Sequence, residues 1–194
     1  MENLRTEIKK FVERLSMDEI KERLVEYMAK ERCATIFPVA LSVKNVHHKG
    51  TCSQYNVYLT MNNGAEVEVK FPDRPSRLIY IYTLLHPEGF QRRMLEKNNY
   101  KELADLFIQL FATIPDKLFY KSVKKDFNHY VNDAIAKSRR AIRAAVQEAL
   151  LKNQPHSELW NDIEIANPSD HNGRTVIPFA KDRERVIVDE KLSA

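Results

Sequence analysis

Glycine is scarce in this chain, with four residues among 194. Folds that wrap the phosphates of a nucleotide in a glycine-rich loop need more, and neither the GxGxxG nor the GxxxxGK[ST] pattern occurs. Only two cysteines, Cys33 and Cys52, are present, whereas a secreted protein of this size more often carries a larger even set. These absences exclude the common nucleotide-binding loops and predict a protein of a reducing compartment, the cytoplasm.

Long apolar runs are also missing. No stretch approaches the roughly 20 residues that a membrane-spanning helix needs. The first residues, Met1–Arg5, alternate charged and apolar side chains and lack the apolar core of a signal peptide. Hydrophobic residues make up 43% of the chain and charged residues 30%, a normal balance for a globular protein. We therefore expect a soluble protein of one or two domains that does not contact the membrane.

Residues able to perform catalysis or bind a metal do not form a recognisable pattern. One set of histidines and cysteines lacks the close CxxC-type pairs of structural zinc sites. A second set holds a serine, a histidine and an aspartate, but no GxSxG nucleophile elbow accompanies it. The first set is Cys33, His47, His48 and Cys52, and the second is His156, Ser157 and Asp162. We expect no enzyme activity, no metal and no cofactor.

Periodicity predicts an α+β fold. Apolar residues recur at helical spacing over residues 3–15 and about 17–31, and these two helices are expected either to dock on the core or to mediate dimerisation. Residues 39–43 alternate as a strand, and Pro38 before them indicates a strand that begins there or lies at an edge. Tyr55–Met61 and Ala65–Phe71 alternate on either side of Asn62-Asn63-Gly64, which predicts a β-hairpin.

Helices dominate the next part of the chain. Asp73-Arg74-Pro75-Ser76 begins a helix that ends near His86, and further helices are predicted over residues 98–114 and 131–152. A second hairpin is expected between residues 163–165 and 175–177, and a last short strand at Val186–Val188. Residues 112–130 fit a helix or a loop. Aromatic residues alternate with lysines there and fit a buried face better than stacking on single-stranded bases. They are Phe119, Tyr120, Phe127 and Tyr130.

Positive charge gathers in one stretch of the chain. Residues 117–143 carry eight basic and two acidic side chains, although the whole chain has a net charge of only +4. On a helical wheel, residues 131–152 have an apolar stripe around Ile135, flanked by arginine and amide side chains without an acidic residue. Arginine, asparagine and glutamine can donate bidentate hydrogen bonds to base edges, and arginine also pairs with phosphates. The flank comprises Asn132, Arg139, Arg140, Arg143 and Gln147.

Three passages between Tyr55 and Phe179 occur in a characteristic order. They are the Asn62-Asn63-Gly64 hairpin, the helix end Leu84-Leu85-His86-Pro87-Glu88-Gly89, and the run Asn132–Arg143 with its xIxxxRxxI/L rhythm. With these passages, residues Tyr55–Phe179 resemble the winged-helix effector domain of response-regulator transcription factors. The chain departs from the family in having a longer segment at 112–130 and no receiver domain. It therefore resembles a divergent, stand-alone member, with residues 1–50 as an N-terminal helical segment with an edge strand and 51–194 as a winged-helix-like domain.

The resemblance implies a bacterial transcriptional regulator that binds double-stranded DNA. Residues 131–152 would be its recognition helix and residues 163–179 its wing. Contacts to bases and phosphates would come from Asn132, Arg139, Arg140, Arg143 and Gln147, with further phosphate contacts from Lys121, Lys124, Lys125 and Arg174. A winged-helix shape also serves protein contacts, so a protein-interaction or oligomerisation module remains the alternative. Under either function we expect a homodimer formed through the N-terminal helices.

Overall fold

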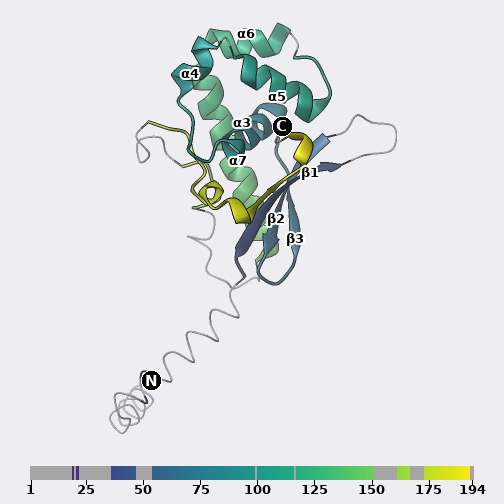
Figure 1. Ribbon diagram of the computed structural model, residues 1–194, viewed down its shortest axis with the longest axis vertical. Coiled ribbons are helices and arrows are strands. Elements are labelled where there is room, and N and C mark those ends of the chain that lie inside the picture. Colours follow the sequence, from purple (N-terminus) through teal and green to yellow (C-terminus); the bar gives the residue numbers. More distant parts are fainter. Residues whose placement is uncertain are drawn as a thin grey trace, which may run out of the picture. The chain divides into compact units, whose positions relative to one another are not determined.

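The computed structural model describes residues 36–46, 54–98, 100–115, 117–150, 161–166 and 173–192, together with Glu19 and Lys21. The chain divides into two compact units, residues 1–36 and 37–194. The helices predicted over residues 3–31 belong to the first unit and, except for Glu19 and Lys21, lie outside the described residues. The elements given below belong to the second unit, which mixes helices with a sheet, as the α+β prediction requires (Figure 1).

Four strands form a mixed sheet in the order β3-β2-β1-β4. The strands are β1 (Pro38–Val46), β2 (Gln54–Met61), β3 (Glu66–Val69) and β4 (Val186–Val188). β1 pairs antiparallel with β2 and parallel with β4, so it is an inner strand and not the predicted edge strand. The last strand of the chain pairs with the free side of β1, a long-range pairing that the local pattern does not reveal. Pro38 stands at the first position of β1, as predicted.

The hairpin of β2 and β3 is confirmed. Leu59 lies opposite Val67, and Gly64 has the positive φ of +82° that the tight turn requires. The Met61 N–H donates to the carbonyl oxygen of Ala65 at 2.8 Å, which closes the turn. The predicted inward residues of β2 are all buried, and they are Tyr55, Val57, Leu59 and Met61.

The helix α3 (Arg74–Leu85) begins where the sequence predicts it. The Asp73 carboxylate caps it by accepting from the Ser76 N–H at 2.9 Å, and Pro75 occupies the first turn. The helix ends at His86, and its side chains from Leu78 to Leu84 are almost fully buried. α3 is therefore the central helix of the core.

The helix predicted over residues 98–114 is α5 (Lys101–Phe111), which is shorter at both ends. A further helix before it, α4 (Arg92–Lys97), was not predicted. Tyr100 and Ala112 flank α5 in the left-handed region, with φ of 60° and 46°. Because both flanking residues leave the helical conformation, α5 begins later and ends earlier than the apolar pattern indicates.

Residues 117–149 are almost entirely helical. α6 (Lys117–Lys125) and α7 (Phe127–Ala149) meet at Asp126, whose carboxylate caps α7 by accepting from the His129 N–H at 2.9 Å. The predicted helix at 131–152 thus begins four residues earlier and ends three residues earlier. α7 packs on α3 and β3, and Figure 1 shows it running from the end where α4 and α6 lie toward the sheet.

The predicted second hairpin is wrong for the described residues. Residues 161–166 and 173–177 share the single bond from the Ala166 N–H to Val176 O, at 2.8 Å, and form no strand pair. Thr175 instead forms an isolated antiparallel bridge with Phe90, between α3 and α4. After this bridge the chain enters a short 3-10 helix, Pro178–Lys181, and then reaches β4, whose position is as predicted.

Candidate nucleic-acid interface

α7 presents its polar flank beside a wide buried stripe. Val131, Ile135, Ile142 and Val146 are buried, as the wheel predicts. Three alanines that the prediction left out are also buried, and the stripe is therefore broader and turned toward them. They are Ala134, Ala141 and Ala145. Their small side chains allow α7 to approach its neighbours closely. The polar flank faces residues 161–166, to which Arg139 and Arg143 are hydrogen-bonded.

Arg143 and Arg139 hold a buried carboxylate. Arg143 donates to Glu164 from Nε at 2.6 Å and from Nη2 at 3.1 Å, and the Arg139 Nε lies 3.9 Å from the same carboxylate. The Glu164 side chain is only 7% exposed, whereas that of Arg143 is 53% exposed. The hydrogen bond with Glu164, opposed by partial burial, raises the pKa of the Arg143 guanidinium. The flank is acid-free within α7, but the fold adds Glu164 to it.

Arg139 also joins α7 to the chain beyond it. Its Nε donates to the carbonyl oxygen of Ile165 at 2.9 Å. Together with the Arg143–Glu164 pair, this bond fixes residues 161–166 against the helix. Arg139 and Arg143 therefore have a structural role in addition to any contact with a ligand.

Arg92 was not predicted, yet it contacts the same flank. From the start of α4 it donates to Asn132 Oδ1 at 2.8 Å and to Asn128 Oδ1 at 3.3 Å. Burial lowers the pKa of its guanidinium, and no carboxylate in the described part of the chain pairs with it. The adjacent basic pair Arg92-Arg93 was visible in the sequence, but its position beside α7 depends on the α4–α7 packing.

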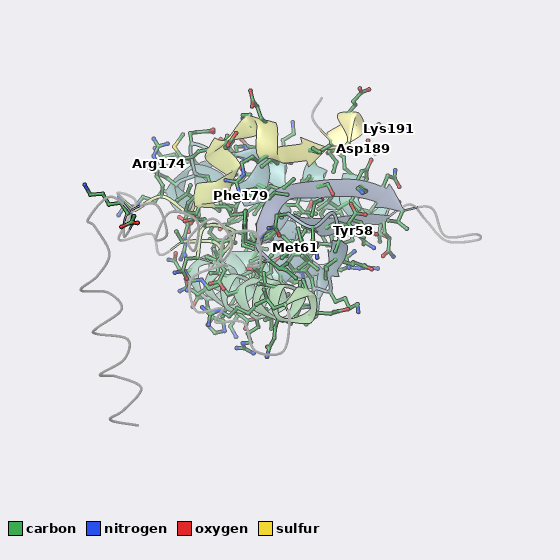
Figure 2. All side chains as sticks on the ribbon, turned by 90° about the horizontal axis from the view of Figure 1, so that it is seen from below. Tyr58, Met61, Arg174, Phe179, Asp189 and Lys191 are labelled. Carbon is green, nitrogen blue, oxygen red and sulfur yellow. The ribbon has the colours of Figure 1, made fainter. Side chains whose placement is uncertain are left out.

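Arg174 lies beside Gly89, in the segment that follows α7 in the chain. Its Nη1 donates to Glu88 O at 3.1 Å and to Gly89 O at 3.4 Å. Carbonyl oxygens fix the guanidinium without neutralising its charge. Figure 2 shows Arg174 at the opposite side of the view from Asp189 and Lys191.

The remaining predicted contacts differ in their surroundings. Arg140 and Gln147 are exposed on α7, and neither has a hydrogen-bond or ion-pair partner within the described residues. Lys124 and Lys125 are exposed in the last turn of α6. Lys121 belongs to the same helix, but its side chain is outside the described part. Arg140 is thus the exposed arginine of the predicted set that makes no bond to the rest of the described chain.

The aromatic residues near α6 are mostly core. Phe119 and Phe127 are 8% and 4% exposed, so they are not available for stacking on bases, whereas Tyr120 is 36% exposed. Among the residues that the structure describes, no group of histidine, cysteine or acidic side chains could hold a metal. The candidates Cys33, His47, His48 and Cys52, together with His156 and Ser157, lie outside those residues.

None of the helices in the described ranges is long and apolar enough to cross a membrane. Comparisons with protein-family models, with curated proteins and with solved structures found no match.

Proposed function

We propose that this protein binds double-stranded DNA through α7 and the segments beside it, as a transcriptional regulator with a winged-helix-like domain. One observation carries the proposal. Three guanidinium groups, from Arg92 in α4 and from Arg139 and Arg143 in α7, are fixed by hydrogen bonds along one flank of α7, and Glu164 is the one carboxylate that these bonds involve. A fourth, that of Arg174, is fixed by the carbonyl oxygens of Glu88 and Gly89.

Fixed guanidinium groups suit a phosphate backbone because their rotamer entropy is already lost before binding. Three arginines with one carboxylate among their partners leave an excess of positive charge on this flank. Arg140, one residue beyond Arg139 and without a partner in the described residues, is then the side chain best placed to contact a base edge or a phosphate. The exposed Gln147, two turns further along α7, supplies an amide for the same purpose.

Two features support a winged-helix-like arrangement. The chain runs from α3 through the Phe90 bridge to α4 and α5, and then to α6 and the long α7. The segment after α7 returns along its flank and pairs with Phe90 through Thr175. Thr175 pairs with Phe90 in place of the predicted wing hairpin, and in this position Arg174 would lie next to a phosphate beside the groove that α7 occupies.

The test is binding of a fluorescent duplex, measured by anisotropy over a series of salt concentrations. We expect a steep fall in affinity with salt, because bound phosphates release counterions. Arg140→Ala should weaken binding roughly 5- to 100-fold without loss of fold. Lys191→Ala, which removes one charge on the side away from Arg174, is the matched control. Absence of binding to any duplex at low salt would contradict the proposal.

Replacing Arg139, Arg140 and Arg143 together would be a poor test. Removal of Arg143 leaves the buried Glu164 without its bidentate partner, and removal of Arg139 frees Ile165 O. We expect such a variant to lose stability as well as binding. Arg140→Ala separates the two effects, because that side chain makes no bond to the rest of the described chain.

A protein-interaction module is the second candidate. Exposed apolar side chains near the ends of α4 and α5 favour it, since such residues are enriched where proteins associate. They are Met94, Ile108 and Ile114, which are 55%, 42% and 79% exposed. A discrete complex with a protein, formed by a chain that binds no duplex, would support this candidate over DNA binding.

A further inference from the structure

A pocket of about 470 Å³ opens between α4 and α7, next to the segment that carries Arg174. Its volume is in the range of small-molecule sites. The pocket was not part of the predicted interface, which lay on α7, α6 and the wing. Its lining residues are Gln91, Arg92, Arg93, Glu96, Asn128 and Gly173.

The lining of this pocket carries more positive than negative charge. Arg92 and Arg93 contribute two guanidinium groups, and Glu96 is the single acidic residue of the lining. No hydrogen bond or ion pair joins Glu96 to either arginine in the described part of the chain. Because Arg92 is partly withdrawn from water, its charge favours an anionic partner more than that of a fully solvated arginine would.

The hydrogen-bonding pattern of the wall favours an anion too. Arg92 uses two of its five N–H groups on Asn128 and Asn132, which leaves three for a ligand. The Asn128 oxygen accepts from Arg92, so its amide N–H groups remain as donors. The wall therefore offers several N–H donors from Arg92 and Asn128, and the hydrogen bond between these two side chains fixes their positions. Several fixed N–H donors suit the acceptor oxygens of a phosphate group.

We propose that this pocket binds a phosphate group through the guanidinium groups of Arg92 and Arg93 and the side-chain amide of Asn128. The phosphate belongs either to the DNA backbone, in which case the pocket extends the proposed duplex interface, or to a small phosphate ester. The chemistry at the pocket is the same for both sources.

Inorganic phosphate is the first probe, added to the full chain at constant ionic strength with chloride as the balancing anion. Phosphate stabilises many proteins weakly by exclusion from their surface, so the informative quantity is the difference between variants. We expect the wild-type Tm to rise by about 3–6 °C more than that of Arg93→Ala at a phosphate concentration near ten times the Kd. Lys191→Ala should behave as wild type.

A conservative substitution is required at Arg92, because this residue also joins α4 to α7 through Asn132. Arg92→Lys keeps the charge but loses the planar fork, and we expect at least a fivefold loss of phosphate affinity by titration calorimetry. Glu96→Gln should raise the affinity, because it removes the acidic residue from the lining. Equal phosphate responses in wild type, Arg92→Lys and Arg93→Ala, or no response in wild type, would overturn the proposal.

Competition distinguishes the two sources. If the pocket takes a backbone phosphate, a nucleoside monophosphate should compete with a fluorescent duplex, and Arg93→Ala should reduce the salt slope of duplex binding by about one. If it takes a small ester, the monophosphate binds and the duplex is not displaced. Phosphate binding that persists in a chain unable to bind any duplex would contradict the proposed function alone. Duplex binding without a phosphate response would overturn the pocket alone.

Discussion

At the scale of single residues, the same side chain type plays two roles on the flank of α7. Arg139 and Arg143 hold Glu164 and Ile165 O, whereas Arg140 between them makes no bond within the described part of the chain. Adjacent arginines in a helix point 100° apart, so neighbours in sequence reach different surroundings. A substitution series on this helix therefore has to treat each arginine separately.

Gly89 is the residue whose replacement tests the bridge beside Arg174. It has a φ of +75°, and a Cβ there would lie 3.0 Å from Thr175 O and 3.2 Å from Val176 Cβ. We expect Gly89→Ala to lower the free energy of unfolding by about 2–4 kcal/mol, because it adds a clash with backbone to an unfavourable φ. Urea unfolding measures the loss.

Gly64→Ala is the matched control for Gly89. Gly64 has a similar φ of +82°, but a Cβ there would meet nothing within 4 Å. We expect this control to lose only about 1–2 kcal/mol, from the φ alone. If the two variants lose the same free energy of unfolding, the backbone at the Phe90–Thr175 bridge shifts to accommodate the added methyl group.

At the scale of elements, α3 and α7 are joined at the start of α3. The Asp73 carboxylate both caps α3 and accepts from Lys137 of α7 at 2.7 Å. Burial raises the pKa of Asp73, but hydrogen bonds from Lys137 and Ser76 lower it more, so the pKa lies below its ordinary value of 3.8. A depressed carboxylate pKa contributes stability above the unfolded pKa, and this stability is lost as pH falls through the folded pKa.

Two substitutions separate these contributions. Asp73→Asn keeps a capping oxygen and removes the charge, so we expect a loss of about 0.3–1 kcal/mol at pH 7 for a pair that is partly exposed. That difference from wild type should stay constant down to the unfolded carboxyl pKa of about 4 and shrink as pH falls below it, because the wild-type carboxylate then becomes protonated. Asp73→Ala should lose about 0.5–2 kcal/mol more, from the cap itself. Urea unfolding at several pH values checks both, and a pH-independent loss in Asp73→Asn would contradict the ion-pair contribution.

At the scale of the whole molecule, the chain divides into two compact units, 1–36 and 37–194, which can be produced and tested separately. The sheet and the described core lie in residues 37–194. We expect a protein of residues 37–194 to unfold cooperatively in urea and to sediment as a monomer, and the full chain to sediment as a dimer through its amphipathic N-terminal segment. If the shortened protein dimerises as well, self-association belongs to the larger unit.

Local patterns determined several elements without help from the fold. The alternation of β2 and β3 and the Asn-Gly turn specify the hairpin, and Asp73 with Pro75 specifies the start of α3. The apolar stripe of α7 also follows from periodicity, since a buried helical face repeats every three to four residues. These features depend on neighbours in sequence, which is why periodicity and turn chemistry predict them.

The tertiary structure decided which partners the polar residues have. The alternation of Ile163-Glu164-Ile165 indicated a strand of a wing hairpin, but the fold buries Glu164 between Arg139 and Arg143 and pairs Thr175 with Phe90. Arg92 reaches Asn132 across 40 residues of sequence. The helical wheel predicts arginines without acidic partners on the flank of α7. Because a charge takes its partner from whatever packs beside it, the folded chain shows a partly neutralised, hydrogen-bonded set, with Arg140 left open.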